Sequence, residues 1–327
     1  MVEMEHPSKN PNKRQIDKKK VVSWIGTILM VASLVFLGRR LFIYNDDFDA
    51  SVFLSARVAV GLIIVTLFEG LGILLAGTNF RSLVKNVSGV LVERPLAMVV
   101  YTLSNLYKYI PGGVMYVVGR NRLAVETEEL SHPQVALSTV LEGIIIAFAA
   151  IILVLITVFN QASEYLRQEE LPTVLVIIII IILVIAGSVA FSFRSKLKEG
   201  SQKLFEHMRV LSISVLIKRF GFGLLLMTFW GGTFLATLMV LGQPLTISQW
   251  PTVIGLFLLS WLAGFLTPGA PSGLGIREVV MLAFMGNMLN EEILLSAMIV
   301  HRIVAAAGDI AAYGLAMGYA HIAKNKK

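Results

Sequence analysis

Two segments of the chain combine basic side chains with prolines and glycines, and each could bind an anion. In the first, a lysine lies beside phenolic donors at a break in an apolar run, and glycines allow a ligand to approach the backbone. These properties suit a phosphate group. The residues of this segment that we expect to contact a ligand are Asn105, Lys108, Tyr109, Pro111, Gly112, Gly113 and Arg120.

This first segment also has a structural interpretation. Lys108 can extend its ammonium group to the membrane interface, and Arg120 and Arg122 can simply mark the cytoplasmic side. Both interpretations stay open for the two arginines. A lysine so close to a Pro-Gly-Gly break favours a functional role.

The second segment is a glycine-rich loop followed by an arginine and a glutamate. A helix that begins near Gly275 would direct its free N–H groups and its positive dipole end at the loop, and Arg277 can bind two phosphate oxygens at once. The alternative is an Arg277–Glu278 pair that only stabilises the helix start. We favour a functional role for Arg277, because an unpaired charge inside a membrane is costly. The expected binding residues are Gly273, Gly275, Arg277, Glu278 and, in the next apolar run, Arg302.

Further polar residues lie within apolar runs. Glu69 is a candidate proton or cation site, or it pairs with a neighbouring donor. Glu142 comes early in its run, where a carboxylate complements the helix dipole, so structural and coupling roles are both open. Arg302 and Asp309 lie seven residues apart and could pair, or they could contact the second segment. Asp309 is also a candidate residue for proton coupling, as Glu69 is. We expect a structural role for His301.

Composition places the chain in a membrane. Of its 327 residues 56% are hydrophobic and only 15% charged, and the mean hydropathy is +0.77. A soluble domain has about 25% charged residues, so a water-soluble enzyme is excluded. The net charge of +7 lies in segments that flank apolar runs, which favours the membrane surface over nucleic acid as a partner.

Several chemistries have no matching residues. The chain has no cysteine, which excludes disulfides, thiolate metal sites and cysteine nucleophiles. Phosphate-binding and dinucleotide-binding glycine motifs, histidine pairs at metal spacing and a serine elbow are also missing from the sequence. We therefore expect no cofactor, no metal and no catalytic residue in this chain.

The fold class predicted is an all-α polytopic membrane protein. About 20 apolar residues of helix cross a bilayer core. Seven segments approach that length: 21–38, 52–77, 134–159, 172–193, 220–241, 248–267 and 293–319. Two further segments, 96–119 and 267–289, are broken by proline and glycine, and we interpret each as a re-entrant pair of half-helices.

These segments divide into two halves. We expect a disordered basic tail (1–20), a first half (21–160), a second half (161–322) with a cytoplasmic amphipathic segment (194–219), and a basic tail (323–327). Lysine and arginine remain on the cytoplasmic side, which places both termini there. The second half then repeats the order of the first with inverted topology. Breaks at corresponding positions of inverted halves indicate a substrate site where the two tips meet near the midplane. The alternative is two unrelated kinks in ordinary spans.

At these two segments the chain resembles the flippase-like transmembrane region of lysylphosphatidylglycerol synthases, which also occurs as stand-alone membrane proteins. The likeness covers about residues 20–320. It is carried by Asn105, residues 108–113, Gly119, Arg120, residues 260–265, Pro268, Gly269, residues 273–278 and Arg302. Members of the family often have a Glu-Arg pair at the position of Glu142, but here Gly143 follows.

The resemblance implies a multi-pass plasma-membrane protein that moves a phospholipid, such as lysyl-phosphatidylglycerol, or a lipid-linked precursor between leaflets. In larger members a cytoplasmic domain transfers lysine from lysyl-tRNA to phosphatidylglycerol. This chain ends at Lys327, soon after its last apolar run, so we expect no such domain. The alternatives are a membrane subunit of a lysyltransferase-type enzyme, with a separate transferase subunit as partner, and a scaffold for envelope biosynthesis.

Overall fold

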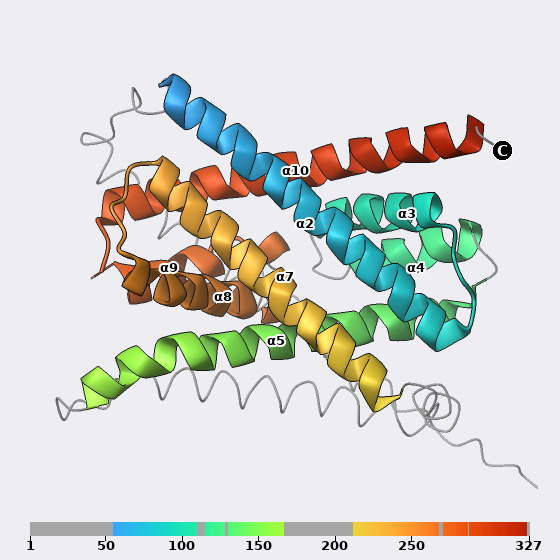
Figure 1. Cartoon of the computed structure of the whole chain (residues 1–327), viewed down its shortest axis with the longest axis horizontal. Helices are drawn as coiled ribbons and strands as arrows, with labels where there is room; N and C mark the ends of the chain where they lie inside the picture. The colour runs from blue at the N-terminus through green and yellow to red at the C-terminus, as the bar shows by residue number, and fades with distance from the viewer. Residues whose placement is uncertain are drawn as a thin grey trace, which may run out of the picture.

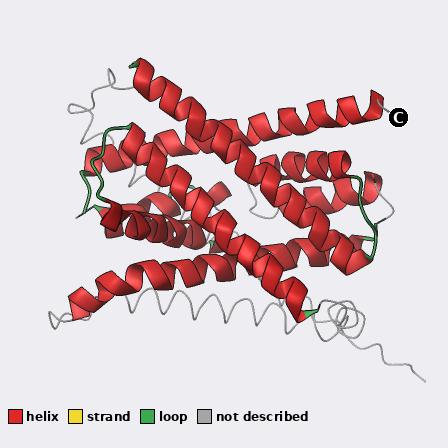
Figure 2. Cartoon of the chain, in the orientation of Figure 1, coloured by secondary structure: helices red, strands yellow, loops and turns green. Residues whose placement is uncertain are grey.

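The computed structural model describes residues 55–109, 115–127, 130–166, 212–267, 271–286 and 288–325. Within these ranges the regular elements are helices (Figures 1 and 2). The expected tail at 1–20, the spans expected at 21–38 and 172–193, and Pro111, Gly112 and Gly113 lie outside the described residues.

Four long helices form the frame: α2 (Ala56–Ser88), α5 (His132–Leu166), α7 (Ile213–Val240) and α10 (Glu291–Asn325). A serine hydroxyl caps the first turn of both α2 and α7, through Ser55 and Ser212. At the other end of α2, Gly89 adopts a left-handed conformation with φ 76°. The cap at Ser212 also corrects an expected boundary, because residues 213–219 belong to α7 and not to a separate amphipathic segment; residues 194–211 are not described.

The first broken segment is a helical hairpin. Its arms are α3 (Arg94–Leu106) and α4 (Met115–Thr127), which pack against each other, and the 3-10 turn η2 (Tyr107–Tyr109) ends the first arm. Pro95 lies in the first turn of α3, where its missing N–H costs nothing. The α-helix thus ends before Lys108, inside the segment predicted to be broken.

The second broken segment and the helix before it also form a hairpin. Its arms are α8 (Trp250–Leu266), preceded by η3 (Ile247–Gln249), and α9 (Ile276–Met285); η4 (Pro271–Gly273) lies between them. The sequence predicts a separate span at 248–267, because the segment has the length and apolar composition to cross a membrane. In the structure α8 packs along α9 as α3 packs along α4. Helix α8 is therefore both a candidate span and the packing partner of α9.

The packing of the two hairpins is reciprocal. The hairpin arm α3 packs on α10, and α8 packs on α5; α2 crosses α10, and α7 crosses α5. Figure 1 shows α2 and α7 running beside each other in opposite directions, with one hairpin on each side of them. Each of these contacts of α2 and α3 thus has a counterpart made by α7 or α8. The two breaks therefore occupy corresponding places.

The crossing of α2 and α10 is tightly packed and lies beside two acidic residues. At Gly308 of α10, an added Cβ would lie 2.6 Å from the Cβ of Glu69 and 3.0 Å from the backbone nitrogen of Gly70. Glycine at both positions therefore allows the backbones of α2 and α10 to touch. This contact fixes Glu69 and Asp309, the neighbours of these glycines, close to one another.

The outer surface of the long helices is apolar. On α2 the exposed residues include Val60, Ile63, Ile64, Leu67, Phe68 and Leu71. Soluble monomers rarely expose a continuous apolar patch of this kind. Five described helices are long and apolar enough to cross a membrane. The chain therefore has the all-helical architecture of a membrane-embedded protein.

Candidate functional site

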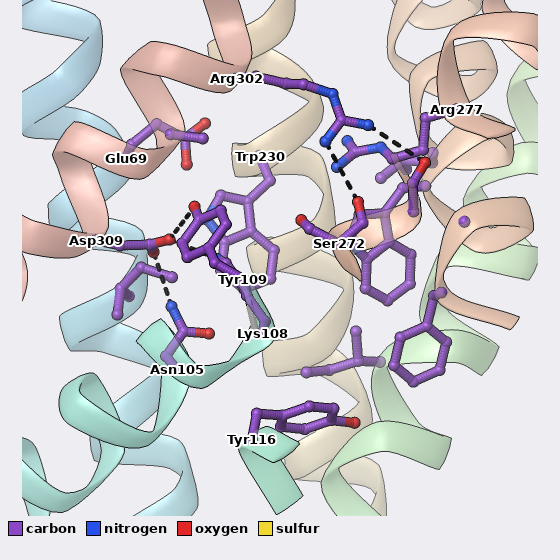
Figure 3. A pocket seen from close by; sticks show the side chains of 18 of the residues that line it. Glu69, Asn105, Lys108, Tyr109, Tyr116, Trp230, Ser272, Arg277, Arg302 and Asp309 are labelled. Atoms are coloured by element: carbon purple, nitrogen blue, oxygen red, sulfur yellow. Dashed lines mark hydrogen bonds and ion pairs between the residues drawn. The ribbon is translucent and has the colours of Figure 1, made fainter. Parts of the chain in front are cut away.

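A pocket of about 410 Å³ lies where the two hairpin tips meet the long helices. Its walls come from both hairpins and from α2, α5, α7 and α10 (Figure 3). The tips contact each other through η2 and η4, which confirms the prediction that they meet. Four basic and four acidic side chains line this pocket: Lys108, Arg120, Arg277, Arg302, Glu69, Glu142, Glu278 and Asp309.

Asp309 gathers the polar residues of the first tip. Its carboxylate lies 2.6 Å from the Nζ of Lys108, and it accepts hydrogen bonds from the Nδ2 of Asn105 at 2.8 Å and the Oη of Tyr109 at 2.6 Å. Figure 3 shows these side chains converging. The sequence predicts both Lys108 and Asp309 as functional, but it does not predict their pairing. The charge of Lys108 is thus balanced within the protein.

Arg120 is paired as well. Its Nη1 lies 2.5 Å from Oε2 of Glu142, and its Nε donates a hydrogen bond to the hydroxyl of Ser104 at 3.1 Å. The guanidinium lies 4.1 Å from the ring centre of Tyr101. Both charged groups are buried, with side-chain exposures of 3% and 5%. Arg120 is therefore not an interfacial marker, and Glu142 neutralises it from α5.

The third ion pair, between Glu278 and Arg302, lies at the second tip. Glu278 forms an ion pair with Arg302 of α10 and accepts a hydrogen bond from the backbone N–H of Gly275 at 2.8 Å. Arg302 also donates to the carbonyl of Gly273 at 3.3 Å. Of the two arrangements open for Arg302, contact with the second segment is the one found. The ion-pair partner of Glu278 is Arg302, so the alternative of an Arg277–Glu278 pair is not found.

Two glycines at this tip, Gly273 and Gly275, are required by the backbone geometry. An added Cβ at Gly273, where φ is 67°, would lie 2.6 Å from the Cα of Gly264 on α8. Gly275, directly before α9, has a φ of 86°. Both positions require glycine, because a side chain would separate the two arms or strain the backbone. Their role is to shape the tip. Arg277 follows two residues after Gly275.

Arg277 differs from the other three basic residues. It lies deep in the protein with part of its surface facing the pocket, and its guanidinium is 5.1 Å from the ring centre of Phe257. Among the described residues, no carboxylate lies within ion-pair distance of Arg277 and no acceptor receives a hydrogen bond from it. Lys108, Arg120 and Arg302 each have such a partner. Arg277 is thus the basic group of the described pocket that is available to a ligand.

The reciprocal packing allows Arg277 to be compared with Arg120. Arg120 and Arg277 each lie nine residues after the proline of the Pro-Gly step in their own segment. Each stacks on an aromatic ring of the first arm of its hairpin, Tyr101 for one and Phe257 for the other. The two arginines therefore occupy corresponding sites. Glu142 balances the first, and the second has no described equivalent of Glu142.

Glu69 resembles Arg277 in having no oppositely charged lysine, arginine or carboxylate partner among the described residues. It accepts or donates a short hydrogen bond with the hydroxyl of Thr233 on α7, and its Oε1 lies 3.6 Å from Nε2 of His301. No lysine or arginine within the described ranges pairs with it. His301, expected to be structural, packs edge-on against Phe234 and lines the pocket beside Glu69.

Several pocket residues are not predicted from the sequence. Thr233, Trp230 and Phe257 contribute walls or hydrogen bonds, yet in an apolar run they resemble ordinary core positions. The only available signal is a threonine four residues before a second threonine, Thr237, on one helix face. Among the described residues no group of three acidic or histidine side chains could hold a metal.

No protein-family model and no curated protein matches the chain. The resemblance to the membrane region of lysylphosphatidylglycerol synthases therefore stays a prediction carried by the motifs.

Proposed function

We propose that this protein is a lipid translocase that moves an anionic phospholipid or lipid-linked precursor between leaflets. The observation that carries the proposal is Arg277, which has no ion-pair or hydrogen-bond partner among the described residues, in a pocket where Lys108, Arg120 and Arg302 are each paired. A half-buried guanidinium without a partner is partly desolvated, which is unfavourable, and a phosphate that accepts two parallel hydrogen bonds from it offsets this cost. The positive end of α9 adds to the attraction.

The two hairpins support a transporter in particular. In this proposal both enter and leave the membrane on one face, so that their tips hold the substrate near the midplane. The chain then has six full spans, two of which, 21–38 and 172–193, lie outside the described residues. An even number of spans agrees with two cytoplasmic termini. The count of seven does not.

The distribution of basic residues supports the predicted orientation. In Figure 1 the end of α2, the start of α7 and the end of α10 lie toward the same side of the molecule. That side carries Arg81, Lys85, Arg94, Lys218, Arg219 and Lys324. We assign this side to the cytoplasm of a plasma-membrane protein. Rocking of the two sets of helices about the α2–α10 and α5–α7 crossings would expose the pocket alternately to each leaflet.

The lipid headgroup is a phosphate ester, since that is the chemistry Arg277 recognises. Lysyl-phosphatidylglycerol, suggested by the family resemblance, is one lipid of this class. Its acyl chains would remain in the bilayer. A separate transferase subunit is compatible with this proposal and is not required by it.

Comparing outer-leaflet lipids in cells with and without the protein tests the function. We expect one phosphate-bearing lipid to be depleted from the outer leaflet of deletion cells and restored by the wild-type protein. Arg277→Gln should fail to restore it. Arg122→Gln is the matched control, because Arg122 is an exposed arginine paired with Glu126 outside the pocket. Unchanged lipid sidedness in the deletion cells, or full restoration by Arg277→Gln, would contradict the proposal and favour a scaffold.

A further inference from the structure

Four acidic side chains line the pocket, and Glu69 differs from the other three in its partners. Glu142, Glu278 and Asp309 each lie against a lysine or arginine. Glu69 is 6% exposed, and among the described residues its polar contacts are the hydroxyl of Thr233 and the ring of His301. A buried carboxyl group without a cation is favoured in its neutral, protonated form. Its setting is therefore that of a proton-binding group.

The hydrogen bonds around Glu69 accommodate that proton. The hydroxyl oxygen of Thr233 lies within hydrogen-bond distance of Glu69 and also 2.7 Å from the carbonyl oxygen of Trp230. A hydroxyl has one proton to donate, and a carbonyl can only accept. When Thr233 donates to Trp230, the contact with Glu69 needs a proton on the carboxyl group. Protonated Glu69 thus completes this network.

His301 is placed to exchange that proton. The hydroxyl of Thr237 is 2.9 Å from the carbonyl of Thr233 and 3.1 Å from Nδ1 of His301. When Thr237 donates its single proton to the carbonyl, Nδ1 must be the donor in the second contact. The other ring nitrogen, Nε2, then presents its lone pair toward Glu69 at 3.6 Å. A neutral imidazole therefore lies next to the carboxyl group.

Other charged groups face Glu69 from the elements around it. They are His301, Arg302 and Asp309 on α10, Lys108 and Tyr109 on η2, and Arg277 on α9. The Lys108–Asp309 and Arg302–Glu278 pairs are internally balanced. Arg277 is the charge that remains, and Figure 3 shows it across the pocket from Glu69. The charge state of Glu69 and the occupancy of Arg277 consequently influence each other.

We infer that Glu69 is a proton-binding site linked to the anion site at Arg277, so that lipid-phosphate binding and protonation of Glu69 promote each other. This inference rests on the proposed function of the pocket. With the pocket empty, ionised Glu69 is attracted by Arg277. Once a phosphate neutralises Arg277, an ionised Glu69 would repel it, and a proton removes the repulsion. The anionic lipid and one proton then move together, which allows a pH gradient to bias the direction of transport.

The pH dependence of lipid binding tests this inference. The full chain in detergent is titrated with short-chain phosphatidylglycerol, whose phosphodiester keeps one negative charge, from about pH 5 to about pH 9, a range that covers buried carboxyl groups. For one linked proton, we expect the dissociation constant of the wild type to rise by up to about tenfold per pH unit above the titration of Glu69. Glu69→Gln, which resembles the protonated form, should bind tightly and without this dependence.

Two control variants locate the proton. Glu126→Gln removes an exposed carboxylate outside the pocket and should keep the wild-type pH profile. His301→Gln should also keep a pH dependence that originates from Glu69. A profile that survives Glu69→Gln, or that is lost only in His301→Gln, would overturn the inference. A third result would also overturn it: Glu69→Gln binds an amine-bearing lipid more weakly than the wild type does, and the wild type binds phosphatidylglycerol without pH dependence. Glu69 would then be a binding site for an ammonium group.

A second measurement does not depend on any variant. Adding the lipid to the wild-type protein in weak buffer with an indicator dye should produce net proton uptake of up to one proton per site. Lipid binding without uptake at any pH would overturn the linkage while leaving the proposed function intact. No binding at any pH would instead contradict the proposed function itself.

Discussion

At the scale of single residues, the pocket holds two arginines in corresponding places with opposite electrostatic surroundings. Arg120 is buried against Glu142, and Arg277 is half-buried without a described carboxylate partner. Removing one member of a buried ion pair leaves an uncompensated charge, whereas removing an unpaired charge relieves a penalty. The two residues should therefore respond in opposite ways to the same substitution.

We expect Arg120→Gln to destabilise the protein by about 3–5 kcal/mol, the usual cost of breaking a buried pair. Arg277→Gln should leave the stability unchanged or higher while abolishing transport. Thermal unfolding of the purified variants in detergent measures the difference. Equal destabilisation by both substitutions would show that Arg277 has a structural partner in the protein, contrary to our assignment.

The sequence predicts the residue types of the site better than their partners. Lys108, Arg277, Glu278, Arg302 and Asp309 all line the pocket, as their position inside apolar runs suggested. Their pairing depends on which helix faces meet, and that is decided by tertiary packing. Asp309 and Lys108 lie about 200 positions apart in the chain, so no local rule relates them. Glu69 differs from the other pocket carboxylates only in its tertiary partners, which the sequence does not show.

At the scale of helices, the crossing of α2 and α10 positions the acidic residues. An added methyl group at Gly308 would lie 2.6 Å from the Cβ of Glu69, closer than real Cβ contacts allow. Separating these helices would also displace Asp309 and its partners at the first tip. The crossing is therefore a point where a small change affects both packing and the site.

Gly308→Ala should lower the free energy of unfolding by about 1–3 kcal/mol, as expected for overpacking, and should reduce lipid exchange. Gly314→Ala is a matched control on the same helix, because an added Cβ there has no atom within 4 Å. Its stability should be unchanged or slightly higher. Thermal unfolding and transport assays on both variants distinguish them. A tolerated Gly308→Ala would mean that the crossing is loosely packed.

Breaks caused by proline and glycine can be predicted from the sequence, whereas the packing partner of a helix cannot. The interruption after Leu106 and the helix start after Gly275 follow from proline and glycine. Helix α8 has the length and apolar character of a span, and nothing in its own sequence shows that it pairs with α9. Its contacts with α9 supply the information that the sequence lacks.

At the scale of the whole molecule, the reciprocal packing of α2, α3, α4 and α5 with α7, α8, α9 and α10 suggests inverted halves. If α8 and α9 form a re-entrant hairpin, both of its ends face the outside. If α8 is a full span, the two ends face opposite sides. The absence of cysteine from the sequence makes this a simple labelling experiment.

We expect Ser248→Cys and Asn290→Cys, at the two ends of this hairpin, to react in intact cells with a membrane-impermeant maleimide. Lys85→Cys, at the end of α2, should react only after the cells are permeabilised. All three positions are well outside the pocket. Labelling of Ser248→Cys and Asn290→Cys from opposite sides of the membrane would instead show that α8 is a full span, as in the seven-span topology.

Lipid exchange by the purified protein tests the central claim most directly. Vesicles containing the wild type, Arg277→Gln or Arg122→Gln are loaded with headgroup-labelled phosphatidylglycerol, and the loss of the label from one leaflet is followed. We predict accelerated exchange for the wild type and Arg122→Gln, and a rate at least about tenfold lower, equivalent to about 1.4 kcal/mol, for Arg277→Gln. No acceleration by the wild type, or equal rates for all three proteins, would contradict lipid translocation through this pocket.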